Sequence, residues 1–494
     1  MATPISASML YNLVQCPKRV ALDLFGDPSI RDEVSAFVQL LWEQGAAYEQ
    51  KVMASGAHQA LDLSAFEGHE KERLTFEAMA RGEPLIYAGR ISADDLAGIP
   101  DLLRKVVGGY VPVDIKSGAG KEGGGEDDDG KPKLPYAVQL CLYVDVLERL
   151  GLSAGRQAWI YDVRGEEVLY DLDAPRGLRG KLTIWEEYQD RLTEARRIVA
   201  SGGLCRGALS AKCKECHWRG ACSMELKSND DLTLIPQLGR ALRDVMVDTI
   251  GSVSEFALCD PEAFVVGKKT VFAGIGPDRL RKFHLRARLL SDPDAQPMLT
   301  GVVSLPCSEV ELFFDIEVDT MRDLTYLHGI VERRGGVSTG EKFHAFFAED
   351  ETPEAEREAF ARSFALLTAD PAATIWYYSK YERTLYRKLQ ARYPDVCSAE
   401  DVEQLFDPRR AIDLYYDVVT KATEWPTNDH SIKTLAKYLG FARRDNNPSG
   451  AASIEWFDQW VKTRDPTVRQ RILDYNEDDC RATRVLLDGI RGLE

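Results

Sequence analysis

Two acidic segments of this chain have the residue types and spacing that metal-dependent chemistry requires. In the first segment, Asp114 and Lys116 lie two positions apart in the apolar run from Tyr110 to Gly118, and Asp101 precedes them. Because side chains alternate along a strand, Asp114 and Lys116 are expected to face the same side. Carboxylates can hold Mg²⁺ while a lysine polarises the attacking water. A surface strand with one solvated ion pair would have the same sequence.

The second acidic segment is a strand expected at residues 310–319. Asp315 and Glu317 share one face of this strand, in an apolar context. Two carboxylates on an otherwise buried strand repel each other unless a cation lies between them. Near the C-terminus, Tyr475 and Asp479 lie one turn apart on an expected helix. For Asp315 and Glu317 the open alternative is a salt-bridged edge strand.

A group of cysteines forms a third candidate site. Cys213, Cys216 and Cys222 have the spacing C-x2-C-x5-C, but a tetrahedral zinc site or an iron–sulfur cubane needs four ligands. Cys16 is the best candidate for the fourth ligand, and Cys205 could replace it. Unligated buried thiols are the remaining alternative.

The composition sets the context for these sites. The 494 residues are 44% hydrophobic and 29% charged, which is typical of globular domains. No apolar run has membrane-spanning length, and the N-terminus lacks a signal-peptide pattern, so we expect a cytoplasmic protein with no membrane partner. Its ten cysteines are then expected to be thiols or metal ligands. The net charge of −17 argues against nucleic-acid binding over the whole surface, but not against local basic patches.

Strand and helix patterns alternate along the chain, which predicts a multidomain α/β protein. A helix carrying Glu49 is expected at residues 31–53, and another from residue 136, with Gln139 and Tyr143 on one face. Residues 119–134, including Asp127 to Asp129, are rich in glycine and charge and are expected to form a loop. In the last third, we expect strands at 310–319, 325–331, 342–348 and 374–378, and helices at 353–369, from 411, at 431–440 and around 475.

The middle segment, residues 227–308, resembles a helix-hairpin-helix region with a degenerate first copy. In its second copy, Gly274-x-Gly276 forms a tight turn that opens a helix, and Arg279, Arg281 and Lys282 follow. Backbone N–H groups at such a turn can bind an anion, and the cations add charge, so these residues are expected to contact a nucleic-acid backbone. An ordinary helical linker is the alternative.

The acids of residues 1–226, in their order and context, resemble the RecB-like branch of the PD-(D/E)XK nucleases, which have an α/β/α fold. The resemblance implies metal-binding roles for Glu49, Asp101 and Asp114, a catalytic role for Lys116, and supporting roles for Gln139 and Tyr143. Several members bind a [4Fe–4S] cluster that clasps the nuclease domain. By position, its ligands here are Cys16, Cys213, Cys216 and Cys222, with zinc as the alternative metal. The long acidic loop after Gly118 departs from the family pattern.

Residues 309–494 resemble the DEDD exonucleases of the RNase H-like α/β/α fold. The resemblance implies that Asp315, Glu317 and Asp479 hold two metal ions and that Tyr475 orients the attacking water. The usual second-motif aspartate is missing. Its place is taken by Glu382, with Asp413 as the fallback. Glu477 and Asp478 are expected to face solvent.

Together, these resemblances point to a family of RecB-like nucleases that join a PD-(D/E)XK domain to a C-terminal RNase H-like exonuclease domain. They imply domains at 1–226, 227–308 and 309–494, Mg²⁺ or Mn²⁺ as cofactor, and nucleic acid as substrate, with DNA favoured over RNA. Some members continue into a helicase. This sequence has no Walker A motif, so a helicase is expected only as a separate partner. The alternatives are a nucleic-acid-binding scaffold with one or both sites degenerate, and a redox protein that uses the cluster.

Overall fold

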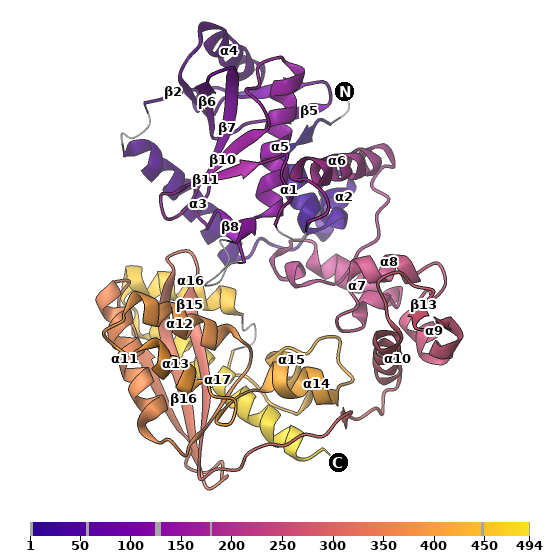
Figure 1. Cartoon of the computed structure of the whole chain (residues 1–494), viewed down its shortest axis with the longest axis vertical. Helices are drawn as coiled ribbons and strands as arrows, with labels where there is room; N and C mark the ends of the chain where they lie inside the picture. Colours follow the sequence, from indigo (N-terminus) through magenta and orange to yellow (C-terminus); the bar gives the residue numbers. More distant parts are fainter. Residues whose placement is uncertain (1–2, 56–58, 124–129, 178–179, 446–448, 494) are drawn as a thin grey trace. The chain divides into compact units, whose positions relative to one another are not determined.

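The computed structural model describes residues 3–55, 59–123, 130–177, 180–445 and 449–493, and the chain forms two compact units (Figure 1). The first unit is Met1–Glu225 and the second is Leu226–Glu494. The domain limits expected from the sequence, 1–226, 227–308 and 309–494, stay predictions. Within the described part of the chain, no helix is both long and apolar enough to cross a membrane.

A mixed six-stranded sheet forms the centre of the first unit. Its strands lie in the order β11-β10-β7-β6-β3-β2. In that order they span Glu167–Asp171, Gln157–Tyr161, Gly109–Ile115, Leu102–Val106, Leu85–Tyr87 and Leu61–Asp62. β7 pairs in parallel with β10 and antiparallel with β6, so the expected strand at 110–118 lies inside the sheet. The strand ends at Ile115, and Lys116 follows it directly.

Helices cover both faces of this sheet. On one face, α3 (Ala36–Ala54) shares a core with Leu102 and Val113. On the other face, α5 (Leu134–Arg149) shares a core with Leu103. Because neighbouring residues of a strand point to opposite faces, Leu102 and Leu103 fill different cores. The first unit therefore has three layers, and the predicted α/β fold is confirmed.

Smaller elements complete the first unit. Helices α1 and α6 pack with α5, α2 packs with α1 and α6, and α4 and α7 complete the helical part. In the order α1, α2, α6, α4 and α7, they span Ala7–Gln15, Pro17–Phe25, Ile184–Ala200, Gly68–Arg81 and Arg219–Ser228. A small sheet joins β1 (Ile5–Ser6), β5 (Leu96–Gly98) and β4 (Ile91–Ala93).

The loop expected at residues 119–134 contains a short antiparallel pair. Its strands are β8 (Lys121–Glu122) and β9 (Lys131–Pro132). The acidic run Asp127 to Asp129, expected to be solvated, lies outside the described residues.

The second unit is built on a five-stranded sheet in the order β17-β16-β15-β18-β19. These strands span Lys342–Phe347, Leu324–Arg334, Val310–Asp319, Thr374–Tyr377 and Ala411–Asp413. β15, β16 and β17 pair antiparallel, whereas β15, β18 and β19 pair in parallel. The first strand of the segment therefore lies at the centre of the sheet, between one antiparallel and one parallel neighbour.

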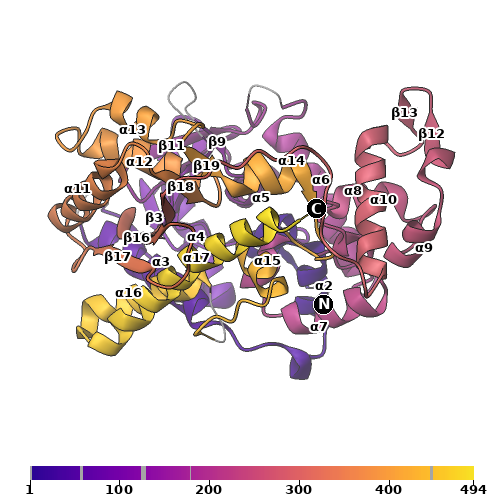
Figure 2. The same cartoon turned by 90° about the horizontal axis from the view of Figure 1, so that it is seen from below.

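The two faces of this sheet are covered by different helices. Phe313 belongs to the core that includes Leu486 of α17 (Pro466–Arg491), whereas Phe314 belongs to the core that includes Phe360 of α11. On the α11 face, α11, α12 and α13 span Pro353–Ala369, Tyr381–Arg392 and Ala399–Leu405. With α17 lie α15 and α16, which span Ile432–Tyr438 and Gly450–Thr463 (Figure 2). Positions 313, 315 and 317 of β15 thus face α17.

One sequence expectation fails in this sheet. A helix was predicted to begin at residue 411, but Ala411–Asp413 is the edge strand β19. The helix begins only after it, as a π-helical turn at Leu414–Val419 that continues into α14 (Thr420–Ala422). The carboxylate of Asp413 accepts the backbone N–H groups of Tyr415 and Tyr416, both at 3.0 Å, and so caps the turn. A three-residue strand is too short to leave a period-two pattern.

The middle residues form a small helical core of their own within the second unit. α8 (Arg240–Met246), α9 (Val253–Leu258) and α10 (Pro277–Ser291) enclose it, together with a short hairpin of β12 (Val265–Val266) and β13 (Lys269–Thr270). The segment is tied to the rest of the unit by β14 (Met298–Leu299), which pairs with β20 (Thr423–Glu424).

Candidate functional site

Three carboxylates from both ends of the last third of the chain meet on the α17 face of the sheet. They are Asp315 and Glu317 of β15 and Asp479 of α17, and their ligand atoms lie within 4.8 Å of one another. Glu317 and Asp479 are buried, and Asp315 is partly buried. Within the described residues, this is the one group of three or more acidic, cysteine or histidine side chains close enough to share a metal ion.

The electrostatics of this group favour a bound cation. Burial, followed by the charges of Asp479, Glu317 and Glu382, raises the pKa of Asp315 well above its usual value. Burial and the charge of Asp479 raise the pKa of Glu317 to about 8, although Lys433 lowers it. Without a cation, this site therefore holds extra protons at neutral pH, and a divalent ion can replace them.

A neutral side chain, Asn476, holds Asp315 in place. Asn476 of α17 donates its side-chain amide to Asp315 Oδ2 at 2.7 Å. Asn476 in turn lies directly against Gly329 of β16, the register partner of Asp315. A Cβ atom on Gly329 would lie 1.6 Å from Asn476 Oδ1, so only glycine leaves room for this amide.

Two cations lie on the other side of the acidic group, around the ring of Tyr475. Lys433 Nζ donates to the Tyr475 hydroxyl at 2.6 Å and lies 4.6 Å from the centre of its ring. Arg443 Nη2 lies 2.8 Å from Asp479 Oδ1. Burial and the neighbouring carboxylates raise the pKa of Tyr475 well above its usual value, so the phenol keeps its proton.

Glu382 and Asp413 lie nearby but outside the group of three. Glu382, on α12, is buried, which raises its pKa to about 8, and it contributes to the raised pKa of Asp315. Asp413 is also buried, and burial raises its pKa to about 6 against the lowering effect of the two backbone N–H groups that it accepts. Its Oδ2 has no hydrogen-bond partner.

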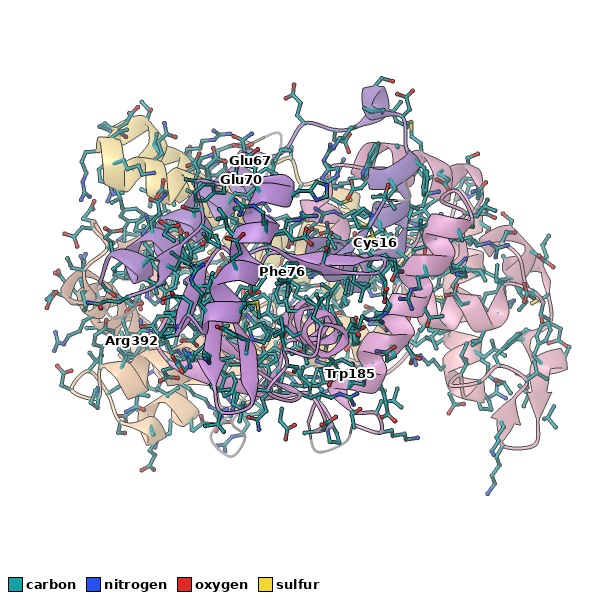
Figure 3. All side chains as sticks on the ribbon, turned by 90° about the horizontal axis from the view of Figure 1, so that it is seen from above. Cys16, Glu67, Glu70, Phe76, Trp185 and Arg392 are labelled. Atoms are coloured by element: carbon teal, nitrogen blue, oxygen red, sulfur yellow. The ribbon has the colours of Figure 1, made fainter. Side chains whose placement is uncertain are left out.

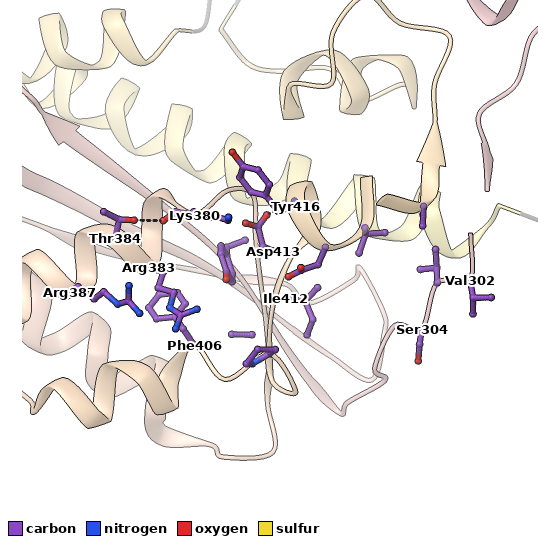
Figure 4. A pocket seen from close by; sticks show the side chains of 17 residues that line it. Val302, Ser304, Lys380, Arg383, Thr384, Arg387, Phe406, Ile412, Asp413 and Tyr416 are labelled. Carbon is purple, nitrogen blue, oxygen red and sulfur yellow. Dashed lines mark hydrogen bonds between the residues drawn. The ribbon is translucent and has the colours of Figure 1, made fainter. Parts of the chain in front are cut away.

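Asp413 lines a cavity of about 500 Å³ at the carboxyl ends of β18 and β19 (Figure 4). Lys380, Arg383 and Arg387 of the α12 region also line it. Both arginines form ion pairs with Glu403, so the cavity is not strongly basic.

One prediction about α17 is wrong. Asp478 was expected to face solvent, but it is buried, and Arg444 covers it with a 2.9 Å hydrogen bond from Nε. Glu477 is largely covered too, because Arg444 and Arg481 pair with it at 2.9 and 2.8 Å. The segment after α15 packs over α17 and creates this contact, which the helical pattern alone does not reveal.

In the first unit, Asp101, Asp114 and Lys116 lie together at the end of β7. Lys116 Nζ is 2.9 Å from Asp114 Oδ2, and Asp101 Oδ2 accepts the backbone N–H of Ile115 at 2.7 Å. Burial and the charge of Asp114 raise the pKa of Asp101 to about 8. Burial lowers the pKa of Lys116, but Asp114 and Asp101 outweigh it, and the net shift is upward.

The other residues predicted for this unit lie around that centre. Glu49 of α3 accepts the hydroxyl of Tyr87 at 2.8 Å and adds to the raised pKa of Asp101. Tyr143 is buried, donates to the backbone oxygen of Ile99 at 3.3 Å, and adjoins both aspartates, whereas Gln139 is partly buried one turn earlier on α5. In the described structure, the carboxylate oxygens of Glu49, Asp101 and Asp114 do not all lie within 4.8 Å of one another, unlike those of the C-terminal group.

The four predicted cysteine ligands line one cavity of about 70 Å³. Cys16 lies between α1 and α2 (Figure 3), and Cys213, Cys216 and Cys222 lie in and before α7. Burial and the neighbouring thiols raise the pKa of Cys222 to about 12. Cys205 is not among the residues that line this cavity.

His217 does not line the cysteine cavity either. Its Nε2 lies 2.7 Å from Asp23 Oδ1, the same oxygen that accepts the indole N–H of Trp218 at 2.8 Å. His217 therefore ties α7 to α2 beside the cysteines.

The residues expected to bind a nucleic-acid backbone lie at the start of α10. Gly274 has a φ of +77°, which favours glycine, and Gly276 caps the helix. Arg281 pairs with Glu262 at 2.6 Å, and Lys282 pairs with Glu424 at 3.2 Å. Arg279 lies over the ring of Phe283. Much of the expected positive charge is thus paired within the protein.

Both halves of the chain match families of known proteins. Residues 7–223 match the PD-(D/E)XK nuclease superfamily, and residues 312–490 match the RNase H superfamily. The chain therefore has a two-domain nuclease architecture, and the predicted resemblance is confirmed at the level of these superfamilies. No curated protein matches the chain.

Sequence reasoning missed several residues that the structure brings to these sites. Asn476 follows Tyr475 directly and could have been noticed by its position on the α17 face. Lys433 lies on the helix predicted at 431–440, but its orientation toward Tyr475 depends on tertiary packing. Arg443 and Gly329 carry no sequence signal, because both act through contacts with distant segments.

Proposed function

We propose that the second unit is a two-metal exonuclease that removes nucleotides from the end of a DNA strand, and that the first unit carries a second, RecB-like nuclease site. The observation that carries the proposal is the convergence of Asp315, Glu317 and Asp479 within 4.8 Å. Such a group of hard oxygen ligands suits Mg²⁺ or Mn²⁺. The three carboxylates come from a central strand and a packed helix, which hold them rigidly.

The residues of the second unit fit divalent metal ions. Asp479 Oδ1 pairs with Arg443 at 2.8 Å, and a carboxylate oxygen has a further lone pair that a metal ion can take. Glu382 supports the same role from α12 as a buried acid next to Asp315. When bound, the two ions would activate the attacking water and stabilise the leaving oxygen.

Tyr475 acts on the water rather than on the metal in this proposal. Its hydroxyl oxygen accepts a hydrogen bond from Lys433, so its own proton remains free to be donated. The raised pKa keeps that proton on the phenol throughout the neutral range. Tyr475 can therefore orient the attacking water by donating a hydrogen bond to it.

The first unit supports a nuclease site of a different kind. Asp101 and Asp114 can hold a metal ion, with Glu49 as a further ligand and Gln139 and Tyr143 as supporting residues. Lys116, 2.9 Å from Asp114, can then orient or polarise the attacking water. Gly274, Gly276, Arg279, Arg281 and Lys282 remain candidates for contact with the nucleic-acid backbone.

We also propose that Cys16, Cys213, Cys216 and Cys222 hold a [4Fe–4S] cluster, with zinc as the alternative. All four line one cavity, and Lys18, Arg19, Lys212 and Arg219 lie in the same wall. Cationic side chains suit the net negative charge of a thiolate-bound cluster. The four sulfur atoms do not all lie within 4.8 Å of one another. A tetrahedral zinc site, with Zn–S bonds of about 2.3 Å, would bring them closer together than that.

Degradation assays test the nuclease proposal. End-labelled linear and covalently circular single-stranded DNA, and the corresponding RNA, are incubated with the full chain and Mn²⁺ or Mg²⁺. Loss of nucleotides from linear but not circular DNA is expected, and Asp315→Ala should abolish it. Lys116→Ala reports separately on the first unit. A wild-type protein that leaves every substrate intact with either metal would refute the proposal.

The second candidate function is a nucleic-acid-binding scaffold with degenerate sites. The observation that favours it is Glu382, which stands in the place of the usual aspartate and lies outside the group of three. A scaffold would bind labelled DNA without degrading it, and Asp315→Ala would not alter its affinity.

We also propose that this protein acts in the cytoplasm, with a separate helicase as its partner.

A further inference from the structure

Arg443 reaches the acidic site of the second unit from the segment that joins α15 to α16. Its side chain is only 10% exposed. Nη2 forms an ion pair with Asp479 at 2.8 Å and donates to the backbone oxygen of Tyr475 at 3.4 Å. The guanidinium lies 5.4 Å from the centre of the Tyr475 ring. Arg443 therefore lies beside both a proposed metal ligand and the proposed water-orienting residue.

The remaining donors of Arg443 are not used within the protein. Nε and Nη1 are both buried and have no hydrogen-bond partner, and among the described residues no other arginine has two such nitrogens. A buried charged donor without an acceptor is costly, so the pair of nitrogens needs an explanation. Each of these two N–H donors points in its own direction, and either can donate a charge-assisted hydrogen bond to a phosphate oxygen.

Arg444, the next residue, provides a sharp contrast. Its backbone N–H and its Nε both donate to Asp478, at 2.8 and 2.9 Å. Its Nη1 also pairs with Asp474 at 3.0 Å and with Glu477 at 2.9 Å. Arg444 therefore fastens this segment to α17, and the side chain of Arg443 is not needed for that purpose.

We propose that Arg443 binds a non-bridging oxygen of the substrate phosphate that enters the acidic site. The inference rests on the proposed exonuclease function of the second unit. An oxygen bound by Nε or by Nη1 would lie beside the guanidinium that pairs with Asp479, and so close to any metal ion that Asp479 holds. Arg443 then positions the phosphate group, while its pairing with Asp479 keeps the guanidinium aimed into the site.

The rival explanation is that Arg443 only neutralises Asp479. The two explanations differ in what the side chain's removal changes. Loss of a phosphate contact raises the KM for the oligonucleotide and leaves metal binding intact. Loss of a counter-ion alters the Mn²⁺ requirement and leaves the KM unchanged.

The test compares Arg443→Gln, Arg443→Lys and the control Arg444→Gln, all as full chains that also carry Lys116→Ala to silence the first unit. Steady-state cleavage of a labelled single strand gives kcat and KM, and a Mn²⁺ titration of the second unit's own thermal transition gives the Mn²⁺ midpoint. For Arg443→Gln, we expect kcat/KM to fall at least about tenfold, the loss typical of a charge-assisted hydrogen bond, mainly through KM. Arg443→Lys should recover part of this loss.

For Arg443→Gln, the Mn²⁺ midpoint should stay within about twofold of the parent chain's midpoint. Loss of one charge-assisted hydrogen bond to the metal site would change it by much more than that. Arg444→Gln should lower the melting temperature and leave KM unchanged. An unchanged KM in Arg443→Gln, or a large shift of its Mn²⁺ midpoint, would overturn the inference. If the parent Lys116→Ala chain cleaves nothing and shows no Mn²⁺ shift, the proposed function itself fails, which is a distinct result.

Discussion

Removing one carboxylate from the acidic group of the second unit should stabilise the metal-free protein. Two unit charges about 5 Å apart repel by roughly 3 kcal/mol at an effective dielectric constant of about 20. Asp315 is repelled by both Glu317 and Asp479, while Lys433 and Arg443 offset part of the repulsion. For Asp315→Asn, we therefore expect a net gain of about 1–3 kcal/mol, because an amide keeps the shape and loses the charge.

This gain can be measured by thermal unfolding in EDTA at pH 8. For a domain of this size, about 1 kcal/mol corresponds to about 2–4 °C, so the transition of the second unit should rise by several degrees. With Mn²⁺ at about 100 times its dissociation constant, the wild type should gain about 2.7 kcal/mol. Asp315→Asn should gain much less, because it has lost a ligand.

The stability gained by Asp315→Asn should also depend on pH and should increase as the pH rises. The pKa of Glu317 is about 8 in the folded protein and near 4.5 when unfolded. Its contribution to stability is therefore fully present below pH 4.5 and is lost as pH rises through 8. At pH 6, Glu317 is already protonated and repels Asp315 less. The advantage of Asp315→Asn should accordingly be smaller at pH 6 than at pH 9.

Glu311 offers a matched control on the same strand. It is buried like Glu317, but it is paired with Arg333 at 2.7 Å and Arg491 at 2.8 Å. Glu311→Gln leaves Arg491 without its carboxylate and Arg333 with Asp488 alone, and should destabilise the protein by about 3 kcal/mol. If Asp315→Asn also lowers the melting temperature in EDTA, the acids of the site do not repel one another as argued here.

Three further predictions concern single contacts. Gly329→Ala should push Asn476 away from Asp315 and lower the cleavage rate of the second unit about tenfold or more, because misplacement of a group by about 1 Å is enough for such a loss. A variant that cleaves at the wild-type rate would show that the Asn476 amide is dispensable. Lys433→Met and Tyr475→Phe should each slow cleavage, and the double variant should be no slower than Tyr475→Phe alone. If the losses in activation free energy add in the double variant, the two residues act independently. Cys216→Ser should give an unstable, colourless protein, and a soluble brown variant would remove Cys216 from the ligand set.

The parts of the fold that were predictable have strong local patterns. β15 coincides with the strand expected at 310–319, because the apolar Phe314 and Ile316 alternate with the two carboxylates of one face. α11 coincides with the helix expected at 353–369, because Thr352 caps it and Pro353 opens it. β19 was missed, since a three-residue strand takes its identity from its parallel partner β18 rather than from its own sequence.

The same distinction between local pattern and tertiary packing applies to the residues of the candidate sites. The spacing of Asp315 and Glu317 is a property of one strand, so their common face could be predicted from the sequence alone. The approach of Asp479 follows from the family resemblance. The role of Arg443 could not be predicted, because it depends on how the segment after α15 folds back over α17. The burial of Asp478 was missed for the same reason, since Arg444 of that segment covers it.

In the first unit, removing a charged side chain should lower the stability of the metal-free protein instead of raising it. There, Lys116 already neutralises Asp114 at 2.9 Å, and Asp114 is only 1% exposed. Lys116→Ala leaves the buried Asp114 and the partly buried Asp101 without a counter-charge and should lower the stability of the first unit by about 3–5 kcal/mol in EDTA. Mn²⁺ should restore part of this loss, because the ion takes the place of the ammonium group. If Lys116→Ala and Asp315→Asn shift their transitions in the same direction in EDTA, then charge balance does not distinguish the two sites.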